Sequence, residues 1–163
     1  TGNVKLQIEK INIVELLNQA IGEFEDKFEA KKLEILLEAK ESEIYILADS
    51  RYMYRIVENL FSNISKYALE NSRVYIDIIK KSNEVYIDGT NVVIEMKNIS
   101  KEKLNISAEE LMQRFVRGDK SRTTEGSGLG ISIAQNLTEI QKGVFNLKLD
   151  GDLFRVELIF NIL

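Results

Sequence analysis

Apolar residues recur along this chain with two periods, and each period predicts a different kind of element. Helical spacing is clearest over residues 51–69, where apolar side chains fill one broad arc of the predicted helix. The members of this arc are Met53, Ile56, Val57, Leu60, Ile64, Tyr67 and Ala68. Alternation is clearest near the C-terminus, in residues 145–149 and 153–160, on either side of Asp150-Gly151. That dipeptide is typical of a tight hairpin turn, so the pattern predicts both amphipathic helices and paired strands.

The same two periods give an order of elements for the whole chain. Strands are predicted at residues 5–9, 33–37, 44–47, 73–80, 91–97, 145–149 and 153–160, and helices at 12–28, 51–69, 108–115 and 131–141. Asn12, Asp49 and Ser107 are placed to cap helices, and turn residues bound a short segment at 84–88. Paired strands mixed with helices favour an α+β fold, a two-layer sandwich with a mixed sheet and helices on one face.

The composition narrows the class of protein. A length of 163 residues fits one domain with a sizeable core. The net charge of −4 argues against a nucleic-acid partner, because such domains usually carry a basic excess. The chain has neither histidine nor cysteine, which excludes disulfides, thiolate chemistry, imidazole catalysis and histidine metal ligands. No run of about 18 apolar residues that could cross a membrane occurs.

A glycine-rich stretch precedes the predicted helix at 131–141. It consists of Gly126, Ser127, Gly128, Leu129 and Gly130. Closely spaced glycines let backbone N–H groups approach a ligand, and the start of a helix adds unpaired N–H groups and a positive dipole end. Together these features favour a phosphate site. A loop that needs positive φ angles would select the same glycines, so both interpretations remain open.

The helix predicted at residues 51–69 carries three polar residues on one side. Asn59, Asn63 and Lys66 fall within about 60° of arc, at the border of the apolar face. An Asn carbonyl oxygen can ligate Mg²⁺, and a lysine can meet a phosphate as a point charge. An ordinary solvated helix face would show the same spacing.

Three stretches in a fixed order resemble the motifs of sensor histidine kinases. Residues 57–68 read VENLFSNISKYA and resemble the N box of that family. Residues 110–122 resemble its F box and the start of its ATP lid, and residues 126–134 resemble its second glycine box. The resemblance extends over about two thirds of the chain. It implies a catalytic ATP-binding domain with the sandwich fold of the GHKL superfamily, also called the Bergerat fold.

The resemblance also implies how this domain is placed in a longer kinase. Residues 11–163 would form the catalytic domain, and residues 1–10 a trailing connector from an upstream dimerisation domain whose helices carry the phosphoacceptor histidine. The implied partners are that helical domain and, through the full-length kinase, a response regulator. The full-length kinase would be a membrane-anchored homodimer with a cytoplasmic catalytic domain. The fragment alone would be a monomer.

Site residues follow from the resemblance, motif by motif. Asn63 would ligate Mg²⁺ between the phosphates of ATP, Lys66 would reach the phosphates, and Tyr67 would border the nucleotide. Arg117 of the lid would face the terminal phosphates. The stretch Gly126 to Gly130, with Ser127 and Leu129 between its glycines, would line the triphosphate through its backbone. Phe115 of the F box is expected to pack in the core.

The chain departs from the family pattern at the first glycine box. The usual motif is Asp-x-Gly-x-Gly, whose Asp accepts from the adenine amino group. The matching run here reads NISKE, from Asn98 to Glu102. Asn98 can still accept through its amide oxygen, but it carries no charge, and both glycines are missing.

The residue four positions before the predicted Mg²⁺-binding Asn63 differs between the ATPases and the histidine kinases of the superfamily. Its ATPases and serine kinases typically place a Glu four residues before the Mg²⁺-binding Asn, where it acts as a general base. Asn59 occupies that position here, and Glu58 lies about 100° away round the helix. This favours histidine kinase over ATPase, with Asn59, Asn63, Lys66 and Arg117 as the catalytic set. The alternatives are an ATP-binding pseudokinase, an anti-sigma-like serine kinase and a nucleotide-free interaction domain.

Overall fold

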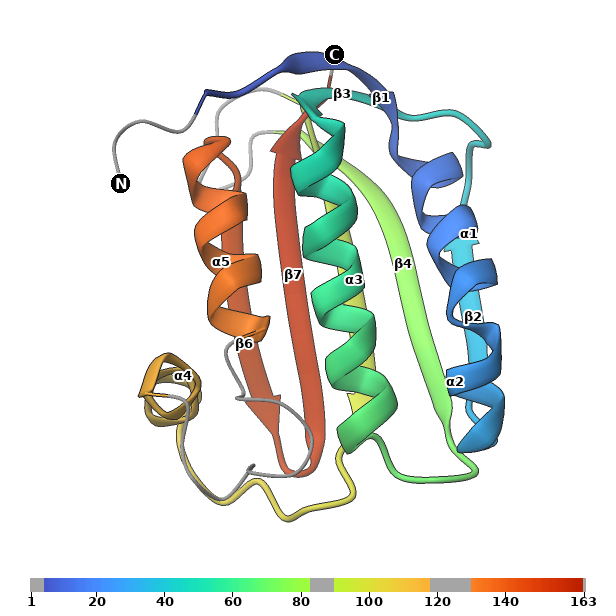
Figure 1. Cartoon of the computed structure of the whole chain (residues 1–163), viewed down its shortest axis with the longest axis vertical. Coiled ribbons are helices and arrows are strands. Elements are labelled where there is room, and N and C mark those ends of the chain that lie inside the picture. Colours follow the sequence, from blue (N-terminus) through green and yellow to red (C-terminus); the bar gives the residue numbers. More distant parts are fainter. Residues whose placement is uncertain (1–4, 83–89, 118–129, 163) are drawn as a thin grey trace.

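A mixed sheet forms one of the two layers of the molecule (Figure 1). The computed structural model describes residues 5–82, 90–117 and 130–162. Within these ranges the sheet has five strands in the order β2 (Glu34–Ala39), β4 (Arg73–Ser82), β5 (Thr90–Ile99), β7 (Leu153–Asn161) and β6 (Val144–Asp150). β2 and β4 are parallel, and every other neighbouring pair is antiparallel. The predicted segment at residues 84–88 lies outside the described residues.

Helices form the second layer and cover one face of the sheet (Figure 1). They are α1 (Ile13–Glu23), α2 (Glu25–Ala30), α3 (Ser50–Tyr67) and α5 (Gly130–Ile140), with α4 (Ala108–Arg117) to one side. This arrangement confirms the predicted α+β sandwich. In the part of the chain that the structure describes, no helix is long and apolar enough to cross a membrane.

The two faces of the sheet differ in polarity. The side chains that point toward the helices are apolar and buried. They include Val74, Ile76, Ile78, Val92, Ile94, Met96, Phe154, Val156 and Leu158. On the opposite face, Lys97 Nζ lies 3.6 Å from Glu95 Oε1 and 3.9 Å from Asp77 Oδ2. Because burying such charges is unfavourable, the helices pack on the apolar face.

One helix predicted at residues 12–28 is broken into two. Asn12 caps α1 as expected, since its Oδ1 accepts from the Val14 and Glu15 backbone N–H groups. The helix ends at Phe24, whose φ of −98° and ψ of 6° lie between α1 and α2. The rings of Phe24 and Phe28 then lie 5.7 and 5.5 Å from the ring of Phe61 on α3. This aromatic cluster, which helical spacing did not indicate, holds α1 and α2 against α3.

A small second sheet joins the N-terminal segment to the domain. β1 (Ile8–Asn12) pairs antiparallel with β3 (Tyr45–Asp49), in register from Ile8 with Asp49 to Asn12 with Tyr45. The first strand therefore lies three residues further along the chain than the alternation at residues 5–9 predicted. Residues 8–10, which we expected in the connector, pair with β3 in this sheet.

Two glycines are expected to respond oppositely to an added methyl group. A Cβ at Gly143 would lie 2.5 Å from Cε1 of the buried Phe160 ring, whereas a Cβ at Gly22 in α1 would meet nothing within 4 Å. We expect Gly143→Ala to lower the free energy of unfolding by about 1–3 kcal/mol through overpacking. Gly22→Ala should raise it by about 0.5–1 kcal/mol, because alanine loses less entropy in a helix. Urea unfolding of both variants tests the packing, and equal shifts would contradict it.

Candidate functional site

A cavity of about 380 Å³ opens beside the C-terminal end of α3. Its walls come from α3, from the end of β5 and the segment that follows it, from α4 and from β7. The lining residues are Asn63, Tyr67, Asn98, Ser100, Glu102, Leu111, Arg114, Phe115 and Phe154. Roughly 300–1,000 Å³ is usual for small-molecule sites, so the cavity is large enough to hold a ligand.

α3 supplies two of the predicted site residues. Asn63 and Tyr67 lie one helical turn apart and both line the cavity. Leu60 and Ile64 on the neighbouring face are buried in the core, which fixes the rotation of the helix. Lys66 does not line the cavity, and its backbone oxygen accepts from Lys31 Nζ at 2.9 Å. That ammonium group caps the negative end of the α3 dipole.

Backbone hydrogen bonds tie the end of α3 to the end of β5. Leu69 N donates to Ile99 O at 2.7 Å, and Lys101 N donates to Tyr67 O at 2.9 Å. Ser100 N donates to Asp152 O at 2.8 Å in the turn between β6 and β7. These bonds fix the cavity wall on which Asn98 and Ser100 lie.

Asn98 is the most deeply buried polar residue of the cavity wall. The residue is 4% exposed, and its side chain has no hydrogen-bond partner among the described residues. Beneath it lies a small apolar gap lined by Leu60, Ile64, Met96, Phe154 and Val156. An unpartnered amide that opens into a cavity beside apolar side chains suits a flat heterocycle with hydrogen-bonding groups on one edge.

α4 forms the opposite wall. Ser107 Oγ accepts from Glu110 N at 3.1 Å, as the predicted capping box requires. Phe115 is 5% exposed and belongs to the core, as expected, but it also lines the cavity. Sequence reasoning missed Leu111, Arg114 and Phe154. Phe154 lies opposite Asn98 in the β5–β7 pairing, a proximity that no local motif indicates.

The start of α5 lies beside the N-terminal half of α3. A Cβ at Gly130, the first residue of α5, would lie 3.7 Å from the Asn59 side chain. Asn59 Nδ2 is buried without a hydrogen-bond partner among the described residues. The structure therefore brings the N-box helix and the end of the glycine stretch together. Gly126, Ser127, Gly128 and Leu129 lie outside the described residues, as does the side chain of Arg117, whose backbone ends α4.

Residues 48–160 match a protein-family model described as histidine kinase-, DNA gyrase B-, and HSP90-like ATPase. The chain belongs to this family. Histidine kinase P4 of Formosa agariphila is 27% identical over 161 residues, which cover 94% of this chain and 11% of the relative. Sensor histidine kinase RppB of Synechocystis is 28% identical over 158 residues, 91% of this chain and 32% of the relative.

A solved structure shares the fold. Full-length ShkA in complex with AMPPNP has a TM-score of 0.74 at 20% identity, over 98% of this chain and 32% of that chain. The domain thus spans about a tenth to a third of the length of these proteins. The predicted resemblance to a histidine-kinase catalytic domain is confirmed.

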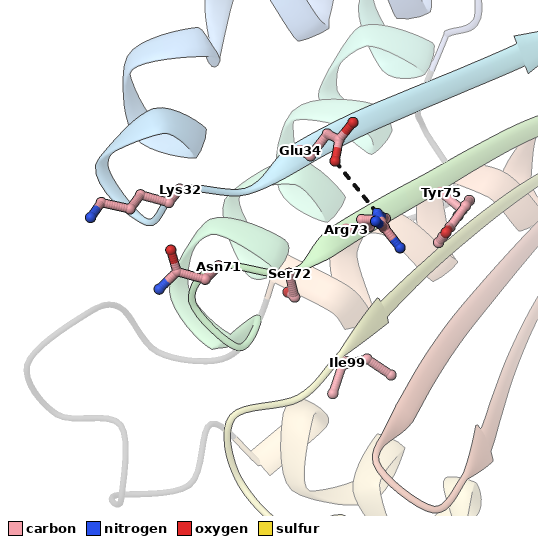
Figure 2. Close-up of a pocket in the computed structure, with 7 residues that line it drawn as sticks. All are labelled: Lys32, Glu34, Asn71, Ser72, Arg73, Tyr75 and Ile99. Atoms are coloured by element: carbon pink, nitrogen blue, oxygen red, sulfur yellow. Dashed lines mark ion pairs between the residues drawn. The ribbon is translucent and has the colours of Figure 1, made fainter.

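A larger cavity of about 570 Å³ lies where β2 and β4 begin (Figure 2). It is lined by Lys32, Glu34, Asn71, Ser72, Arg73, Tyr75 and Ile99. Arg73 Nε lies 3.5 Å from Glu34 Oε1, and Lys32 points away from this pair (Figure 2). Among the residues that the structure describes, none from the N box, the F box or the second glycine box lines it. We therefore assign the candidate site of this kinase-type domain to the smaller cavity.

A buried carboxylate organises the opposite end of α3 from the cavity. Asp49 is 1% exposed, and its side chain accepts from Gln7 N at 2.9 Å and from Arg51 N at 3.0 Å. Its backbone N–H donates to Gln141 Oε1 at 2.8 Å, just after α5. The Arg51 guanidinium, 2.8 Å away, holds the pKa of the Asp49 carboxyl well below its usual range, and burial opposes this only in part. Asp49 thus links the N-terminal segment, α3 and α5.

We expect Asp49→Asn to lower the free energy of unfolding by about 1–3 kcal/mol at neutral pH, because charge-assisted hydrogen bonds and a helix cap are weakened. In the unfolded chain the pKa of an Asp carboxyl is about 3.9, above its pKa in the folded domain. The contribution is therefore complete above about pH 5 and is lost as the pH falls further. Urea unfolding of parent and variant from pH 8 to pH 3 measures this. Asp150→Asn, at the exposed end of β6, is the control. A stability difference that does not change with pH would contradict the assignment.

Proposed function

We propose that this domain binds ATP in the cavity beside α3 and positions the γ-phosphate for transfer to a histidine on a separate helical domain. The single observation that supports this best is the cavity itself. It brings Asn63 and Tyr67 of the N box together with Asn98 of the first glycine box and Phe115 of the F box. Full-length ShkA, which shares the fold, is a complex with AMPPNP, an ATP analogue.

The adenine base would occupy the inner part of the cavity. Asn98 faces it from the β5 end, and Phe154, Ile64 and Met96 border the apolar gap beneath. The Asn98 oxygen would accept from the adenine amino group, and Tyr67 would border the nucleotide. Apolar contacts on the ring faces and a few polar groups at the edge are the usual way to hold a base.

The triphosphate would extend from this base site toward α5. The 11-residue helix α5 begins at Gly130, so its first N–H groups and its dipole favour an anion there. Gly126, Ser127, Gly128 and Leu129 would contribute their backbone, and Lys66 and Arg117 their charges.

Magnesium fits this site only together with the nucleotide. Among the described residues, no group of three or more Asp, Glu, His or Cys side chains could hold a metal alone. Mg²⁺ usually keeps several waters and takes one or two protein oxygens plus substrate phosphates. Asn63 lines the cavity and supplies one such oxygen. The ion would neutralise charge on the phosphates, and Asn63 would orient it.

The chemistry proposed for this chain is positioning rather than proton transfer. Asn59 has no acidic group and cannot act as a base, and the chain contains no histidine to accept the phosphoryl group. Phosphoryl transfer depends mainly on alignment and charge neutralisation. The domain would therefore hold ATP stably until a histidine of the partner domain arrives.

The remaining parts of the proposal concern the longer protein. The acceptor would belong to the kinase's own upstream dimerisation domain, to which residues 1–10 connect. A response regulator would take the phosphoryl group from it. The full-length protein would be a membrane-anchored homodimer with this domain on the cytoplasmic side, and the isolated domain a monomer. The similarity to Histidine kinase P4 and to sensor histidine kinase RppB supports the kinase part of this proposal.

We expect Asn63→Ala to abolish the Mg²⁺-dependent part of ATP binding and to leave the fold intact, because it removes a metal ligand from a half-buried position. Calorimetric titration of ATP with and without Mg²⁺ measures this. Asn18→Ala on α1, outside the cavity, is the control, since the Asn18 side chain only donates to Val14 O. Parent-like Mg²⁺-ATP affinity in Asn63→Ala would remove Asn63 from the site.

We further expect the isolated domain to hydrolyse ATP very slowly and not to phosphorylate itself. Adding the native upstream helices, in cis or as a separate polypeptide, should produce an acid-labile phosphoryl group on those helices, followed with radiolabelled ATP. Acid-stable label on Ser or Thr of this domain would favour a serine kinase. Rapid phosphate release by the domain alone would favour the ATPase branch, and ATP binding without any transfer a pseudokinase.

A further inference from the structure

The Asn98 amide distinguishes the base site of this domain from a site built on a carboxylate. The residue is 4% exposed, lines both the main cavity and the apolar gap beneath it, and has no hydrogen-bond partner among the described residues. A polar group that faces a cavity and has no protein partner is satisfied by water or by a ligand. The amide is therefore available to whatever base enters the cavity.

An amide side chain and a carboxylate offer different hydrogen-bonding groups to a purine. An ionised carboxylate only accepts hydrogen bonds, whereas an Asn side chain has an accepting oxygen and a donating NH₂ group of nearly the same shape. Adenine places a donor, its N6 amino group, next to the N1 acceptor, and guanine places the O6 acceptor next to the N1–H donor. A half-turn of the amide about its last torsion exchanges donor and acceptor, so one Asn side chain complements either edge.

The residues around Asn98 allow its amide to bind the edge of either adenine or guanine. The wall is held by backbone bonds that leave the amide free, from Leu69 N to Ile99 O and from Ser100 N to Asp152 O. Glu102 lines the same cavity, in place of the second glycine of the family motif. Its carboxylate accepts hydrogen bonds only, as the N1–H and 2-amino groups of guanine require. Adenine offers no donor at its 2-position, so this group adds to guanine binding alone.

We propose that Asn98 makes the base site tolerant of both purines, so that the domain binds GTP as well as ATP. This inference rests on the proposed nucleotide function and concerns the substrate class of the same site. The triphosphate and Mg²⁺ interactions are the same for both nucleotides. Selectivity is therefore decided at the base edge, and Asn98 is the specificity-determining residue.

Titration calorimetry of the parent domain with Mg²⁺-ATP, Mg²⁺-GTP and Mg²⁺-UTP tests the proposal. We expect the ATP and GTP dissociation constants to agree within about tenfold, about 1.4 kcal/mol or less, with UTP weaker than both. The affinity for UTP measures the contribution of the triphosphate, because the single ring of uracil is too short to fill the base site as a purine does. A GTP affinity more than tenfold below that of ATP, or a UTP affinity equal to that of GTP, would overturn the inference and leave the proposed function standing. Failure of every nucleotide to bind would instead refute the proposed function.

Asn98→Asp gives the second arm of the test. A carboxylate facing guanine O6 leaves two acceptors opposed, which costs about 1–3 kcal/mol, or about 5- to 150-fold in affinity. GTP affinity should therefore fall by that factor relative to ATP, while ATP affinity is kept or slightly improved. Asn71→Asp adds the same charge at an exposed position outside the cavity, where it lines the other pocket (Figure 2), and should leave the ratio unchanged. An unchanged ratio in Asn98→Asp, in a variant that still binds ATP, would remove Asn98 as the determinant.

Discussion

The hydrogen bonds that join the end of α3 to the end of β5 hold the candidate site together. Leu69 N to Ile99 O and Lys101 N to Tyr67 O are backbone bonds between segments about 30 residues apart. They place the C-terminal end of the helix, which carries Asn63 and Tyr67, against the strand end that carries Asn98. Without this junction the cavity would lose one wall, although the helix and the strand could each still form.

The one-sided sheet is the constraint that sets the position of α3. Apolar side chains cover one face of the sheet, and the ion pairs of Lys97 with Glu95 and Asp77 lie on the other. The helices α1, α2, α3 and α5 therefore share the apolar face. α3 lies in the middle of this layer, with α5 on one side and α1 and α2 on the other (Figure 1). The rings of Phe24 and Phe28 pack against Phe61 of α3. The rotation of α3 is fixed by contacts on three sides, so its polar edge is directed at the cavity and at the start of α5.

Under the proposed function, this arrangement separates two tasks. The cavity side of α3 holds a nucleotide, while Asp49 at the other end of the helix binds the N-terminal segment through Gln7 and the end of α5 through Gln141. The segment that would lead to the phosphoacceptor domain is therefore connected to both helices that border the nucleotide. The helix α3 joins the cavity at its C-terminal end to Asp49 at its N-terminal end.

The sequence by itself determined the class of fold, because helical and alternating periods record which side of each element must leave water. It also indicated Asn63, Tyr67 and Asn98, since the motifs that contain them are local. It did not indicate the break at Phe24, the aromatic cluster around Phe61, or Phe154 and Arg114 in the cavity wall. Those features depend on which elements become neighbours. Only the tertiary structure decided that Phe154 lies beside Asn98 and Gly130 beside Asn59, because strand pairing and helix packing join residues that no periodicity along the chain relates.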